Sequence, residues 1–213
     1  MNFSKRTEWH TPINALTRAR QSKTARGLST LDLTETNPTA VGLDYPIEEI
    51  RSILAEGASA PYEPQAAGLA SAREALARSL SEDGHPVSPD DLILTSSTSE
   101  AYSYLFKLLM DPGDHVLIAT PGYPLFDHLA ALELIELNRF PLELDVRWSL
   151  HADVAAAQMT DRTRAIAVVH PNNPTGSFLL SEEQDGIADL CAERGAALIS
   201  DEVFLDYDFG PDP

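Results

Sequence analysis

Two short polar segments, each at the end of an apolar run, carry residues suited to chemistry on a bound ligand. Asn173 lies in the turn at 171–176, where its amide can donate to a ligand oxygen or bond its own backbone. Asp201 follows the apolar run 196–200, and a carboxylate buried there needs a partner. It can pair with a cationic ligand nitrogen, orient a histidine, bind a metal or cap the next turn. No cluster with metal-ligand spacing accompanies it, so we predict no metal.

A third polar segment, Thr-Ser-Ser-Thr-Ser-Glu at 95–100, precedes a helical pattern. Open backbone N–H groups at a helix N-terminus, together with the hydroxyls of Ser97, Thr98 and Ser99, can hold a phosphate. The same residues contain the capping box Ser97-x-x-Glu100, which any helix can use. If a phosphate binds, we expect Glu100 to turn away from it, because two anions repel.

An aromatic residue follows the next apolar run. Tyr123 stands between Gly122 and Pro124, where its ring can stack on a flat ligand or pack over the turn. The sequence contains neither a G-x-S-x-G motif nor a Walker loop. Their absence argues against the commonest hydrolase and nucleotide-binding classes.

Apolar strands alternate with helical patterns through most of the chain. We predict strands at 92–95, 115–119, 134–137, 164–169 and 196–200, and helices at 47–55, 69–80, 98–110, 124–132, 149–159 and 181–194. Continuous apolar strands indicate burial on both faces, so we predict an α/β fold with a mainly parallel sheet and helices on both faces. Residues 1–30, polar and weakly patterned, are predicted to form an N-terminal arm, and residues 31–213 part of one large domain.

The composition limits the function classes. The chain has 33 acidic and 15 basic residues, a formal charge of −18, which argues against nucleic-acid and basic membrane-surface binding. No apolar run is long enough to span a bilayer, and none near the N-terminus resembles a signal peptide. Cys191 is the single cysteine, so no internal disulfide can form. We therefore expect a cytoplasmic protein.

Taken in order, the motifs resemble the class I and II aminotransferases, pyridoxal-phosphate enzymes of fold type I. Each motif alone is weak, but their order and spacing across residues 30–210 are specific. The motifs are Asn37-Pro38, Tyr62 with Gly68 and 73–76, the segment 95–101, Asp111-Pro112-Gly113-Asp114, 121–124, 172–176, and Asp201-Glu202-Val203-Phe204.

The resemblance implies how pyridoxal 5'-phosphate (PLP) would be held. Thr98 and Ser99, with the backbone of Ser97, correspond to the phosphate cup, and Tyr123 to the aromatic residue stacked on the pyridine ring. Asn173 corresponds to the donor to the cofactor's phenolic oxygen. Ser97 replaces a glycine common in the cup, so its turn must accept a Cβ.

The resemblance also implies the catalytic acid and the assembly. Asp201 corresponds to the acid that keeps the pyridine nitrogen protonated, which lets the ring draw electrons from the substrate's α-carbon. Phe204 replaces the family's usual tyrosine and cannot donate, leaving the phenolic oxygen to Asn173. Tyr62 corresponds to a residue that reaches the neighbouring subunit's phosphate, which implies a homodimer, and Asn37 to a residue on the substrate side.

The implied activity is amino-group transfer from an amino acid to a 2-oxo acid. The family's Schiff-base lysine lies C-terminal to Asp201, whereas the chain's three lysines are Lys5, Lys23 and Lys107. We therefore expect these residues to be the N-terminal portion of such an enzyme, truncated before the C-terminal part of the large domain and the small domain, and inactive alone. Two alternatives stay open: a non-catalytic relic that binds PLP, and a PLP lyase or decarboxylase of the same fold.

Overall fold

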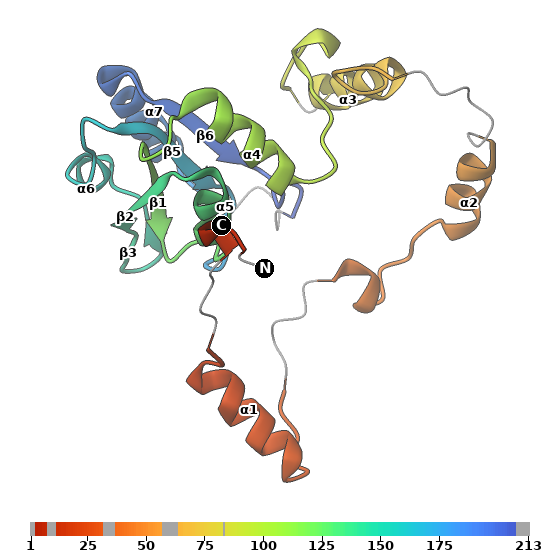
Figure 1. The fold of residues 1–213 in the computed structure, drawn as a ribbon. Coiled ribbons are helices and arrows are strands. Elements are labelled where there is room, and N and C mark those ends of the chain that lie inside the picture. Colours follow the sequence, from red (N-terminus) through yellow and green to blue (C-terminus); the bar gives the residue numbers. More distant parts are fainter. Residues whose placement is uncertain (1–2, 8–11, 32–36, 57–63, 83, 208–213) are drawn as a thin grey trace. The chain divides into compact units, whose positions relative to one another are not determined.

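The computed structural model describes residues 3–7, 12–31, 37–56, 64–82 and 84–207 (Figure 1). The chain divides into two compact units, one of residues 1–8 with 94–213 and the other of residues 9–93. This division falls at residue 93. The arm expected at 1–30 and the partial large domain expected at 31–213 stay predictions. The two units are described separately below.

The larger unit is built on a four-stranded sheet with the strand order β2-β1-β5-β6 (Figure 1). All neighbouring strands in it run parallel. This confirms the predicted α/β fold with a mainly parallel sheet. The strands are β1 (His115–Thr120), β2 (Glu136–Pro141), β5 (Thr163–Val169) and β6 (Ala197–Asp201), and a small antiparallel pair is formed by β3 (Glu143–Leu144) and β4 (Trp148–Ser149).

Helices cover both faces of this sheet. They are α4 (Thr98–Leu109) and α5 (Phe126–Glu133) on one face, α6 (Ala152–Ala156) and α7 (Ser181–Arg194) on the other, and the short turn η1 (Lys5–Thr7) beside α5. Ile118 of β1 packs in the α4–α5 layer, while its neighbour Leu117 packs in the α6–α7 layer. Successive strand side chains point to opposite faces, so both must be apolar, which explains the continuous apolar runs.

Two local predictions from the sequence were wrong, and one helix had no predicted range. No strand forms at 92–95: Leu92 has an extended backbone, but no described strand pairs with it. The helix expected at 149–159 shortens to α6, because Trp148 and Ser149 form β4. The helix α1 (Ala15–Ala25) received no range in the prediction, because it has no buried face; it begins at an Asn14 side-chain cap on Thr17.

The smaller unit holds the remaining helical elements. These are α1, α2 (Ile47–Glu56), α3 (Ala70–Glu82), and the turns η2 (Pro38–Ala40) and η4 (Pro89–Asp91). Arg73 of α3 donates from Nη1 to the Pro89 carbonyl at 2.5 Å and from Nε to the Gly68 carbonyl at 3.3 Å. This guanidinium therefore joins α3 to η4. In the described parts of the chain, no helix is long and apolar enough to cross a membrane.

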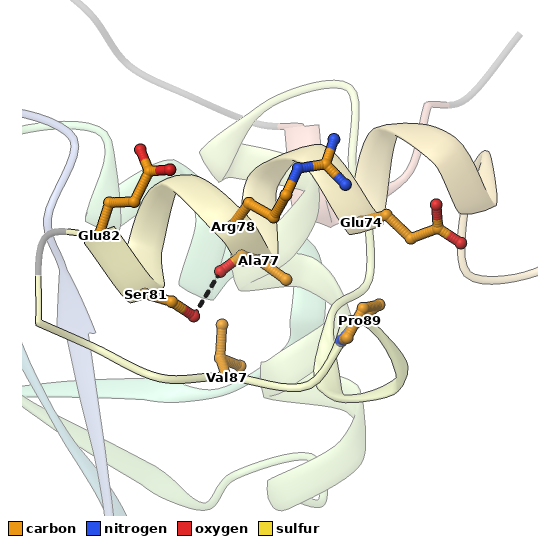
Figure 2. A pocket seen from close by; sticks show the side chains of 7 residues that line it. All are labelled: Glu74, Ala77, Arg78, Ser81, Glu82, Val87 and Pro89. Atoms are coloured by element: carbon orange, nitrogen blue, oxygen red, sulfur yellow. Dashed lines mark hydrogen bonds between the residues drawn. The ribbon is translucent and has the colours of Figure 1, made fainter.

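An open hollow of about 520 Å³ lies beside α3 in the smaller unit (Figure 2). Its lining residues are Glu74, Ala77, Arg78, Ser81, Glu82, Val87 and Pro89. Figure 2 also shows Ser81 Oγ donating to the Ala77 carbonyl, at 2.7 Å, within the helix. None of the site residues predicted from the sequence lines this hollow.

A buried glutamate joins the start of α7 to the segment after β4. The two carboxylate oxygens of Glu183 accept the backbone N–H groups of Leu150 at 2.8 Å and Leu180 at 2.7 Å. Arg147 Nη2 lies 2.9 Å from Glu183 Oε1. Burial raises the pKa of Glu183, but the Arg147 guanidinium and the two backbone donors outweigh it and hold that pKa below its ordinary value.

We predict that Glu183→Gln lowers the free energy of unfolding at pH 7 by about 1–3 kcal/mol, because buried donors lose a charged acceptor. A lowered pKa in the folded state gives stability that is present above the unfolded-state value and lost as the pH falls. The variant should therefore lose less stability than the wild type between pH 7 and pH 3. Urea unfolding at both pH values measures this, with the exposed Glu182→Gln as control; equal stability of the two variants would contradict it.

Candidate functional site

The carboxyl ends of three parallel strands bring three of the predicted site residues, Asp201, Asn173 and Tyr123, to one edge of the sheet. Asp201, the last residue of β6, pairs in register with Val169, the last residue of β5. The turn after β5 is tied to the loop after β1, because Asn172 Nδ2 donates to the Pro121 carbonyl at 3.2 Å. Tyr123 is in that same loop. In an open α/β sheet, this edge is where ligands bind.

Asp201 is buried, with 9% of its surface exposed, and both carboxylate oxygens have donors. Its Oδ2 accepts the Tyr102 hydroxyl at 2.9 Å, and its Oδ1 accepts the Val203 backbone N–H at 3.1 Å. Asp201 shares the strand face of Ile199, two residues earlier, which packs in the α4–α5 layer. Strand alternation thus aims the carboxylate at α4. Asp201 also caps the next turn, as one of the alternatives predicted, but only Oδ1 does so, through the Val203 N–H.

Tyr102 is a site residue that the motif analysis missed. It lies on α4 with 3% of its surface exposed, one helical turn before the fully buried Phe106. A hydroxyl in an otherwise apolar stripe was the available signal, because a buried phenol needs a partner. Burial, and then the Asp201 carboxylate, raise the pKa of Tyr102 well above its ordinary value, so the phenol stays protonated and donates.

Aromatic rings connect this pair to Tyr123. The Tyr102 ring lies edge-on to Phe126, with the centroids 5.1 Å apart, and Phe126 lies edge-on to Tyr123 at 5.9 Å. Gly122 precedes Tyr123 where a Cβ would come within 2.4 Å of the Ala119 carbonyl oxygen. Only glycine fits this close approach, and it sets the direction in which the chain leaves β1.

The N-terminus of α4 keeps two backbone donors open. Ser97 is the N-cap, and its hydroxyl accepts the Glu100 N–H at 3.2 Å, as the capping box predicts. The Glu100 carboxylate differs from that motif: its Oε2 accepts the N–H of Ser96 at 2.6 Å and not that of Ser97. Within the described residues, no group accepts a hydrogen bond from the backbone N–H of Thr98 or Ser99.

The backbone conformation of Ser97 and the hydrogen bonds of Glu100 are both compatible with an anion at this N-terminus. Ser97 has φ −167°, an extended conformation open to any residue, so the serine costs nothing where the family often has glycine. The N–H and hydroxyl of Ser96, with the hydroxyl of Tyr104, hold the pKa of Glu100 below its ordinary value. The anionic Glu100 is thereby kept on Ser96, which leaves the first turn of α4 available to another anion.

The two asparagines of the turn at 171–176 play different parts. Asn172 is buried, and its Nδ2 donates to the Pro121 carbonyl and to Thr175 Oγ1, the latter at 2.8 Å. The side chain of Asn173 is partly exposed and makes no hydrogen bond to any described residue. Asn172 is therefore the asparagine that holds the turn in place, and the amide of Asn173 stays available.

The remaining predicted residues are Phe204, Asn37 and Tyr62. Phe204 follows β6, is partly buried and lies edge-on to Tyr207 with the ring centroids 6.3 Å apart. Asn37 belongs to the smaller unit and caps η2, since its Oδ1 accepts the Thr39 N–H at 3.0 Å. Tyr62 lies outside the described residues.

Lys107 serves helix packing. Its Nζ donates to Glu133 Oε1 of α5 and to Ser103 Oγ of its own helix, each at 2.5 Å. Its side chain is 59% exposed. The residue sits in the last turn of α4, past Tyr102, where it joins the two helices on their outer side. This placement agrees with the interpretation that Lys107 is not a Schiff-base lysine.

Comparison with known proteins places the chain in a family. The sequence pattern of the family "Aminotransferase class I and II" matches residues 33–213. Nicotianamine aminotransferase 1 of Oryza sativa subsp. japonica is 32% identical over 151 residues, which cover 70% of this chain and 31% of that protein. S-alkyl-thiohydroximate lyase SUR1 of Arabidopsis thaliana is 29% identical over 167 residues, which cover 78% of this chain and 36% of that protein.

The fold leads to the same family. The solved structure of an alanine aminotransferase from Pyrococcus furiosus superposes with a TM-score of 0.82 at 27% identity, covering 95% of this chain and 52% of that one. The chain therefore belongs to the class I and II aminotransferases, as its motif order predicted. It spans between about a third and half of the length of these three relatives.

The two neighbouring asparagines give a matched test of the site's construction. We predict that Asn172→Ala lowers the free energy of unfolding by about 1–3 kcal/mol, because two partly buried hydrogen bonds are lost and the Pro121 carbonyl is left unpaired. Asn173→Ala should change it by less than about 0.5 kcal/mol, as expected of a side chain without partners. Urea denaturation of both variants checks this, and equal losses would disprove the division of roles.

Proposed function

We propose that the protein is a PLP-dependent aminotransferase that moves an amino group from an amino acid to a 2-oxo acid. The observation that carries the proposal is the buried carboxylate of Asp201, held at the carboxyl end of β6 on the sheet edge that also gathers Asn173 and Tyr123. Membership of the aminotransferase family supports this role for the carboxylate.

The available groups fit PLP. The open N–H groups of Thr98 and Ser99, at the positive end of α4, suit a phosphate. The unpaired amide of Asn173 suits the phenolic oxygen, and the ring of Tyr123 suits the flat face of a pyridine. Bound there, PLP supplies a protonated pyridine ring that withdraws electrons from the substrate's α-carbon.

In this proposal each side chain has a defined task. Asp201 holds the proton on the pyridine nitrogen through a charge-assisted hydrogen bond. Asn173 donates to the phenolic oxygen without help from Phe204, which has no hydroxyl. Thr98 and Ser99 bind the phosphate while Glu100 stays on Ser96.

The assembly and the substrates follow from the family. We propose amino acid and 2-oxo acid substrates, with Asn37 on the substrate side, and a homodimer in which Tyr62 reaches the partner's phosphate. None of Lys5, Lys23 and Lys107 matches the Schiff-base lysine, so we propose that sequence outside these 213 residues contributes it. We also propose a cytoplasmic location, which fits the single cysteine.

A second candidate function is a PLP lyase. The similarity to S-alkyl-thiohydroximate lyase SUR1 supports it at nearly the same identity as the similarity to the aminotransferases. The residues described above hold and polarise a cofactor, a task common to both reactions. The products distinguish them: amino transfer yields one new amino acid for each 2-oxo acid formed, whereas a lyase needs no amino-group acceptor.

We predict that Asp201→Ala, made in the protein that carries this chain, lowers the turnover number for amino transfer by roughly 10²–10⁴-fold. PLP affinity should fall by less than about 10-fold, since the phosphate contacts persist. Coupled assays of 2-oxo acid and amino acid formation, with PLP titration by absorbance, measure both quantities. The exposed Asp206→Ala is the control. Near-normal turnover of Asp201→Ala would remove Asp201 from this role, and 2-oxo acid release without an acceptor would favour the lyase.

A further inference from the structure

The hydrogen bond between Tyr102 and Asp201 joins residues 99 positions apart in the sequence. Both residues are buried, so the bond forms away from water, where an unpaired partner would be costly. Rings surround the phenol: Phe106 lies 5.7 Å and Phe126 5.1 Å away, measured between centroids. Among the described residues, Asp201 is the one hydrogen-bond partner of the Tyr102 hydroxyl.

The bond restrains the carboxylate more than a single contact would. With Oδ2 on the Tyr102 hydroxyl and Oδ1 on the Val203 N–H, the carboxylate plane cannot turn without breaking one of them. Each carboxylate oxygen can accept more than one hydrogen bond, so the restraint leaves an acceptor for a further donor. A cationic N–H of a ligand is such a donor.

We propose that Tyr102 is a positioning residue that orients the carboxylate of Asp201 toward the pyridine nitrogen of PLP. This inference rests on the proposed function and deepens it. Tyr102 does not touch the reacting atoms; it acts through Asp201, and the raised pKa of its phenol keeps it a donor at alkaline pH.

The position of Tyr102 on α4 adds a second consequence. Thr98 and Ser99 begin α4, and Tyr102 follows Thr98 by four residues, on the same face and about 6 Å along the helix axis. One rigid helix therefore carries both the donors for the phosphate and the residue that orients the acid at the ring nitrogen. In this proposal, α4 fixes the distance between the groups that hold the phosphate and the acid that faces the ring nitrogen.

The test is Tyr102→Phe, which keeps the ring and removes only the hydroxyl. The matched control is Tyr104→Phe on the same helix, whose hydroxyl bonds the exposed side of Glu100 at 2.9 Å. Both variants are made in the protein that carries this chain, and turnover and PLP affinity are measured with PLP and with its 1-methyl analogue. The methyl group makes the ring nitrogen permanently positive, so its charge does not depend on a hydrogen bond to Asp201.

With PLP, we expect Tyr102→Phe to lose about 10-fold in turnover, the scale of one hydrogen bond to a charged group, and Tyr104→Phe to lose less than about 2-fold. With the 1-methyl analogue, the difference between wild type and Tyr102→Phe should shrink to less than about 2-fold. An equal loss with both cofactors, or no loss with PLP, would overturn the positioning role.

A readout on the cofactor-free protein separates positioning from general damage. In a double-mutant cycle of urea midpoints, Tyr102→Phe should shift the midpoint in the wild-type background and much less in the Asp201→Ala background. Equal shifts in the two backgrounds would overturn the pairing. If the wild-type protein bound no PLP, the proposed function would fail too. If wild type and Tyr102→Phe transferred amino groups equally well, the positioning role of Tyr102 would fail and the proposed function would stand.

Discussion

A carboxylate in an apolar layer is the constraint on which the rest of this site depends. Asp201 ends β6 on the strand face covered by α4 and α5, where an unpaired charge would be costly. The structure meets this cost with a phenol from α4 and a backbone N–H two residues further along. The same bonds join α4 to β6 and hold the acid in one orientation. Stability and the proposed chemistry thus rest on the same contacts.

In the candidate site, some polar groups are bonded within the protein while neighbouring ones stay open. Asn172 ties two strand ends together and leaves the amide of Asn173 open, while Glu100 binds Ser96 and leaves the first turn of α4 without a carboxylate. In the first case the Asn173 amide stays available, and in the second the backbone N–H groups of Thr98 and Ser99 do. Polar groups without described protein partners suit the mixed charge of the proposed cofactor.

The motif order predicted the family. The alternation of apolar runs with helical patterns predicted the parallel sheet and placed Asn173, Tyr123 and Asp201 at or just after strand ends. These features are local: continuous apolar runs mark buried strands, and the polar residue after each run must lie at the strand's carboxyl end. The strand expected at 92–95 shows the limit of such reasoning. An apolar run becomes a strand only where a neighbour completes its hydrogen bonds, and no described strand lies beside it.

By itself, the sequence determined which residues stand at the strand ends and at the start of α4, because periodicity and capping act over a few positions. Only the tertiary structure decided what those residues bond. Tyr102 could not be assigned to Asp201 from a separation of 99 residues, and Glu100 could not be assigned to Ser96 over Ser97. Hydrogen-bond partners are chosen by how helices pack on the sheet, and that packing places the phenol of α4 over the end of β6.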